Sequence, residues 1–172
     1  MNNPLLEPSN SPYGTIPFND LKTEHFVPAV TSGIKEAENA LQRIIDCKEN
    51  PTFENTVLAL ELSSRILNTA ANTFFHLFGS ESDQDFKDLS DTISPMLAEF
   101  GNNTYLNEKL FKRIEIVFNN KDLLKDDEDI RLLDVTYNDF VKNGAALSVT
   151  DKAKLRDIDK DLSTLSPQFS KN

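Results

Sequence analysis

The feature that most limits the fold of this chain is the spacing of its apolar residues, which recur every three or four positions in one segment after another. Phe26, Val30, Ile34 and Ala37 show the pattern at the beginning, and Leu155, Ile158, Leu162, Leu165 and Phe169 show it at the end. This spacing puts apolar side chains on one face of an α-helix, whereas a half-buried strand alternates at every second residue. Five glycines and eight prolines are also few for a β-sandwich of 172 residues. The sequence predicts an all-α fold.

About six helices are expected, packed against one another as in an antiparallel bundle. Thr52 and Ser148 are predicted N-caps, Gly79 and Gly144 are predicted stops, and Pro95 is expected to bend the helix that contains it without ending it. The first helix begins near Thr23 or at Pro28. The predicted helices cover residues 23–49, 52–79, 82–100, 106–118, 126–143 and 148–169, with an Asn-rich joint before the fourth.

Two regions are predicted: an extended, Pro-rich arm over residues 1–22 and a helical domain over residues 23–172. The prolines of the arm prevent a regular helix because each removes a backbone donor and restricts the residue before it. The last helix keeps its apolar stripe to Phe169 without a glycine stop, which predicts that the domain is truncated at its C-terminus. Apolar side chains at both ends are therefore expected to lack partners, namely Leu5, Leu6, Ile16, Leu165 and Phe169.

Composition excludes several kinds of partner. A formal net charge of −10 and a pI of about 4.6 argue against nucleic acid, because phosphate binding requires clustered Lys and Arg. There is no apolar run long enough for a signal peptide or a membrane span, and Cys47 alone cannot form an internal disulfide. We expect a cytoplasmic protein with no membrane partner.

No catalytic, cofactor-binding or metal-binding residue is expected in this chain. Zinc hydrolysis typically uses two histidines one helical turn apart with a glutamate, as in HExxH, but His25 and His76 are far apart. Both are predicted to cap helices or to be partly buried. Cys47 lies at the end of a helix, where a thiolate is disfavoured, and is predicted to be a packing residue. The acids at 126–129 are interpreted as the first turn of a helix rather than as a calcium loop.

The order of several short blocks resembles a known family. These blocks are Pro12-Tyr13-Gly14-Thr15-Ile16-Pro17-Phe18, Glu24-His25-Phe26-Val27-Pro28-Ala29, Gly33-Ile34-Lys35-Glu36-Ala37, the run from Pro51 to Glu61, Phe74-Phe75, the run from Tyr105 to Phe111, and Asp151-Lys152-Ala153-Lys154-Leu155. Together they resemble the start of the M3 family of zinc oligopeptidases, and within it the peptidyl-dipeptidase branch, over essentially the whole chain.

The resemblance implies a helical enzyme divided by a deep channel, with zinc, HExxH and a further glutamate in a C-terminal catalytic half that is not part of this sequence. This chain would form one wall of the channel, and short peptides would be the substrates. A free-standing helical interaction module is the alternative, which composition alone permits equally well. The two differ in one respect: an autonomous module should cap its last helix, whereas a part of a larger enzyme should expose apolar surface.

Overall fold

A computed structural model describes residues 3–7, 11–81 and 84–170 and has the expected all-α architecture, with no strand in these ranges. Six helices exceed ten residues in the described chain. They are α1 Phe26–Asp46, α3 Arg65–Glu81, α4 Gln84–Tyr105, α5 Glu108–Asn119, α6 Asp127–Lys142 and α7 Val149–Ser170. Shorter pieces connect them, including α2 at Ala59–Glu61.

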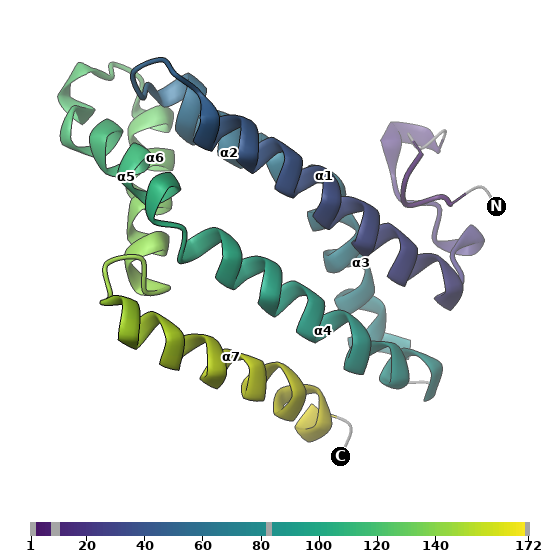
Figure 1. Ribbon diagram of the computed structural model, residues 1–172. Helices are drawn as coiled ribbons and strands as arrows, with labels where there is room; N and C mark the ends of the chain where they lie inside the picture. The colour runs from purple at the N-terminus through teal and green to yellow at the C-terminus, as the bar shows by residue number, and fades with distance from the viewer. Residues whose placement is uncertain (1–2, 8–10, 82–83, 171–172) are drawn as a thin grey trace.

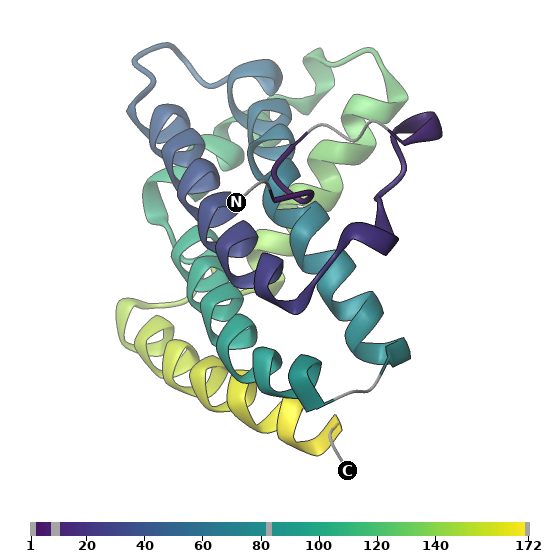
Figure 2. The ribbon, with the colours of Figure 1, turned by 90° about the vertical axis from the view of Figure 1, so that its right-hand side faces the viewer.

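The long helices are arranged around α4. Figure 1 shows α1 on one side of α4 and α7 on the opposite side, with α7 antiparallel to α4. α3 packs mainly against α1 and reaches the beginning of α4 (Figure 2). α5 and α6 form a pair at the other end of α1. α4 is therefore covered on two sides, whereas α7 has one main neighbour.

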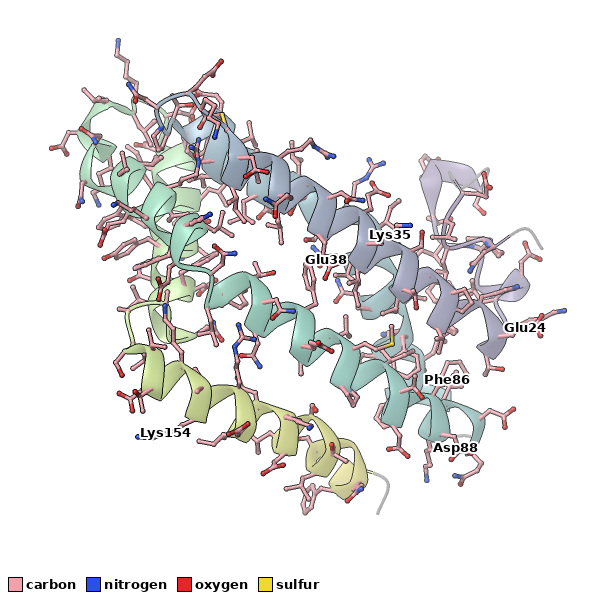
Figure 3. The ribbon with its side chains drawn as sticks, in the orientation of Figure 1. Glu24, Lys35, Glu38, Phe86, Asp88 and Lys154 are labelled. Carbon is pink, nitrogen blue, oxygen red and sulfur yellow. The ribbon has the colours of Figure 1, made fainter. Side chains whose placement is uncertain are left out.

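The largest core cluster lies between α1, α3 and the beginning of α4. Phe26, Phe74 and Phe86 meet there, with ring centroids 5.6 to 6.0 Å apart. Phe86, labelled in Figure 3, extends from α4 toward the start of α1. Gly33 lets α1 and α3 approach closely, since a Cβ at this position would lie 2.8 Å from the Cα of Leu67. This close packing accounts for the burial of much of the apolar face of α1, where seven residues are buried.

The second predicted helix is less regular than the sequence suggests. Thr52 caps it as predicted, accepting a hydrogen bond from the Asn55 backbone N–H at 3.2 Å. Three short pieces then precede α3: a π-helical turn at Phe53–Leu58, α2, and a 3-10 turn at Leu62–Ser64. The Ser63 hydroxyl donates to the Leu60 carbonyl at 2.6 Å, and such side-chain bonds compete with regular helix geometry. The prediction of one continuous helix from Thr52 is therefore wrong. The predicted stop at Gly79 is wrong as well, because α3 continues to Glu81.

Three predictions about the ends and interior of the other helices have different outcomes. The Asn-rich segment is not a joint: α4 runs through it to Tyr105, and Asn107 caps α5 by accepting from the Leu110 backbone N–H at 3.0 Å. α4 also continues through Pro95 as one helix, and the expected bend remains a prediction to be checked by the angle between the axes before and after it. Gly144 follows α6 with a φ of +90°, so the predicted left-handed stop is confirmed.

The arm contains short 3-10 turns at Pro12–Gly14 and Phe18–Asp20 and is bound to the core of this same chain. Leu5 is buried and Leu6 packs beside it in the α1–α3 cluster. The Asn3 side chain donates to the His25 carbonyl at 2.8 Å, which joins the arm to the beginning of α1. The expectation that Leu5 and Leu6 lack partners is wrong, because the apolar surface that they need lies within the chain.

Candidate functional surface

The two histidines do not come together. His25 accepts a hydrogen bond from the Lys22 backbone N–H through Nδ1 at 3.1 Å, so its predicted capping role is confirmed. His76 lies on the exposed surface of α3, with its ring 6.4 Å from that of Phe18. Within the described ranges, no three His, Cys, Asp or Glu side chains gather in a way that could hold a metal ion.

The acidic run at 126–129 begins α6, as interpreted from the sequence. The Asp126 carboxylate accepts from the Glu128 backbone N–H at 2.8 Å, and the next three acids occupy the first turn. Negative charge at a helix N-terminus is favourable because the first backbone N–H groups point toward it. α7 begins in a similar way, with the Ser148 hydroxyl accepting from the Asp151 N–H at 3.2 Å and donating to the Asp151 carboxylate at 2.8 Å.

Arg113 is a buried cation that the sequence reasoning missed. Its guanidinium donates to the carbonyls of Cys47 and Glu49 at 3.0 and 3.4 Å, and to the side-chain oxygens of Asn55 and Thr56 at 3.0 and 3.3 Å. Its Nε has no hydrogen-bond partner. These bonds fasten the end of α1 and the following loop to α5, which is a structural role.

A sequence signal for Arg113 was available. The residue lies on the apolar stripe of α5, between Leu110 and Val117 at helical spacing and next to Ile114. A charged residue at such a position must find polar partners when it is buried. The partners are 57 to 66 residues away along the chain, so only the folded structure identifies them. Cys47 lies half-buried beside this network, consistent with its predicted packing role.

A groove of about 740 Å³ lies between the end of α3, the middle of α4 and α7. Phe75 and Phe78 contribute from α3, Leu97 and Gly101 from α4, and Leu162 from α7. A Cβ added at Gly101 would meet no atom within 4 Å, so this position faces open space. The groove contains aromatic and aliphatic side chains but no clustered catalytic groups.

Tyr105 lines both this groove and a smaller one, of about 350 Å³, between α4 and α6. Burial raises the pKa of the Tyr105 phenol above its ordinary value, and the negative charge of Asp139 adds to the effect. The phenol therefore stays protonated at neutral pH and cannot act as a base there. This arrangement gives the groove a polar edge without a reactive group.

Comparison with curated proteins identifies relatives of this chain, which the geometry of the groove alone does not. Over 98% of its length, the chain is 35% identical to a dipeptidyl carboxypeptidase of Salmonella typhimurium and 34% identical to that of Escherichia coli. The chain is homologous to dipeptidyl carboxypeptidases. Oligopeptidase A of Haemophilus influenzae is 27% identical over the whole chain. The resemblance to the peptidyl-dipeptidase branch is confirmed, although no family model matches the chain.

The chain spans about a quarter of the length of the dipeptidyl carboxypeptidases and of oligopeptidase A, 25% in each case. The similarity therefore concerns one helical part of much longer peptidases. Within the described residues, no helix combines the length and the apolar character that crossing a membrane requires.

Proposed function

We propose that this chain is the N-terminal helical domain of a cytoplasmic zinc metallopeptidase that removes dipeptides from the C-termini of short peptides. In this proposal it forms one wall of the substrate channel, and the C-terminal catalytic half of the same polypeptide supplies the chemistry. The observation that carries the proposal is the 35% identity to dipeptidyl carboxypeptidase over 98% of the chain. Similarity that extends over every helix is not expected of an unrelated interaction module.

The described residues of this chain do not fit a zinc site. His25 and His76 belong to separate elements. In the described ranges, neither of them is part of a group of three side chains that could hold a metal ion. A hydrolytic zinc site needs about three protein ligands converging on one point. We therefore assign zinc to the remainder of the polypeptide and assign a structural role to this chain.

A chimera tests the proposal. Three proteins are compared: the intact Salmonella typhimurium dipeptidyl carboxypeptidase, the same enzyme without the quarter that this chain matches, and that shortened enzyme with this chain in place of the missing quarter. Release of C-terminal dipeptides from an N-blocked peptide is measured by mass spectrometry. We expect the shortened enzyme to be inactive and the chimera to recover dipeptide release.

The isolated chain is the control. We expect it to release no dipeptide and to retain no stoichiometric zinc by elemental analysis, because its described residues bring no ligands together. A folded chimera without activity would contradict the proposal. So would an isolated chain that binds one zinc ion tightly or cleaves the peptide.

A further inference from the structure

Only one residue of the α7 stripe predicted from the sequence, Leu155, is as much as half-buried in the structure. The residues of α7 with the least exposed surface are Lys152, which is buried, and Asp151, Leu155, Asp159 and Ser163, which are half-buried. The other four residues of the predicted stripe are 51 to 82% exposed and form the exposed stripe of α7: Ile158, Leu162, Leu165 and Phe169.

The exposed stripe borders the groove. Leu162 belongs to both, because it is one of the α7 residues that line the groove and is also 51% exposed. On the α3 side, Phe75 lines the groove and is 42% exposed. Gly101 leaves the floor open between the two walls. Scattered single apolar residues are normal on a protein surface, but aligned residues around one hollow indicate a contact site.

We propose that the groove between α3, α4 and α7, together with the exposed stripe of α7, seats an apolar segment from the remaining three quarters of a dipeptidyl-carboxypeptidase-like polypeptide. This inference rests on the proposed function and deepens it, because it names the surface through which this domain meets the rest of the enzyme.

The length of the relatives favours this occupant over others. They contain this domain as 25% of a longer chain, so three quarters of each polypeptide is available to cover the surface. A second copy of this chain is less suited, because a net charge of −10 on each copy opposes self-association. A free peptide is also less suited, because its terminal carboxylate would need a buried cation. The one cation in the described lining of the groove is Lys142, and its side chain is exposed to solvent.

Cysteine labelling measures whether the surface is covered. Leu162→Cys and Leu165→Cys are introduced one at a time with Cys47→Ser, both in the isolated chain and in the chimera with the Salmonella typhimurium enzyme. Maleimide modification of each position is followed over time by peptide mass spectrometry. We expect rapid labelling in the isolated chain, where both side chains are more than half exposed, and labelling slowed at least tenfold in the chimera.

Lys35→Cys is the matched control. Lys35 extends from the outer face of α1, on the far side of α4 from α7 (Figure 3), among the exposed polar residues Thr31, Ser32 and Glu36. Labelling at Lys35→Cys should be equally fast in both proteins. Equal rates in the two proteins at Leu162→Cys and Leu165→Cys would overturn the inference, and so would slowing at Lys35→Cys as large as that at these two positions.

The proposed function and this inference can fail separately. A chimera that releases dipeptides while Leu162→Cys and Leu165→Cys react as fast as in the isolated chain supports the function and contradicts the docking surface. If the chimera does not fold, the same labelling is done on the intact Salmonella enzyme, with cysteines at the positions aligned with Leu162 and Leu165. Rapid labelling of that native enzyme contradicts the docking surface, and protection that disappears on denaturation supports it.

Discussion

α1 and α7 differ by one residue in length, 21 against 22, and each carries an apolar stripe at helical spacing. α1 packs its stripe between α3, α4 and α5, and seven of its residues are buried. α7 contacts mainly α4, and its one buried side chain in the described residues is a lysine. An apolar stripe at helical spacing is therefore not enough to ensure burial, and α7 is also the less amphipathic of the two helices. The neighbours that the rest of the chain supplies decide which helix becomes core.

The largest difference should appear in a pair of phenylalanines, one on each helix. Phe26→Ala removes a fully buried ring of the α1–α3 cluster and should lower the free energy of unfolding by about 3–5 kcal/mol. Phe169→Ala, at a position 82% exposed, should change it by less than about 0.5 kcal/mol. Urea unfolding of the isolated chain measures both. A comparable loss in the two variants would remove the distinction between the helices.

The two buried cations give the next comparison. Arg113→Met removes four hydrogen bonds at the end of α1, leaves buried oxygens without donors, and should cost about 1–3 kcal/mol of unfolding free energy. Lys152→Met removes one ion pair of 3.7 Å with Glu108, whose side chain is 68% exposed. That pair is weak because solvent screens it, so this variant should be neutral or slightly stabilising. A large loss from Lys152→Met would show that α7 is fastened more firmly than its contacts indicate.

Two glycines test the difference between the tightly packed α1–α3 contact and the open groove beside α7, because each can be given a single extra methyl group. A Cβ at Gly33 would lie 2.8 Å from the Leu67 backbone, so Gly33→Ala should force α1 and α3 apart at a cost on the order of 1 kcal/mol. Gly101→Ala adds its methyl group to the open groove and should stabilise α4 by about 0.5–1 kcal/mol, because glycine is a poor helix residue. The measurement is again urea unfolding, and opposite signs are the expected result.

The smallest effect concerns pH and the first turn of α7. Hydrogen bonds from Lys154 and then from Ser148 hold the pKa of the exposed Asp151 carboxyl below its ordinary value of 3.8. The contribution of the Asp151 carboxylate to stability is therefore fully present above the unfolded-state pKa and is lost as pH falls through the lower folded-state pKa. We expect the helical carbon shifts of this turn, followed by NMR, to decline only below pH 3.8.

Asp151→Asn is the control for this titration, because it keeps the size of the side chain and removes the titrating group. The variant should show weaker helical shifts in the first turn at neutral pH and no change with acidification. An Asp151 titration midpoint above 3.8 in the native chain would contradict the proposed capping arrangement.

The sequence by itself determined the helical fold class, the caps at Thr52 and Ser148 and the stop at Gly144, because these depend on residues a few positions apart. The family resemblance was also readable there, because it rests on the order of short blocks. The exposure of Leu165 and Phe169 was anticipated from the uninterrupted stripe of the last helix, and it is confirmed at 56 and 82%.

Only the tertiary structure decided what depends on contacts between distant segments. The burial of Leu5 and Leu6 requires the α1–α3 cluster, and the partners of Arg113 come from a loop more than fifty residues earlier. The orientation of α7 follows the same principle. Its sequence defines an apolar face of five residues, but only Leu155 among them is half-buried, and the other four stay more than half exposed. A periodic pattern fixes which residues share a helix face, and the free energy of the whole assembly fixes where that face points.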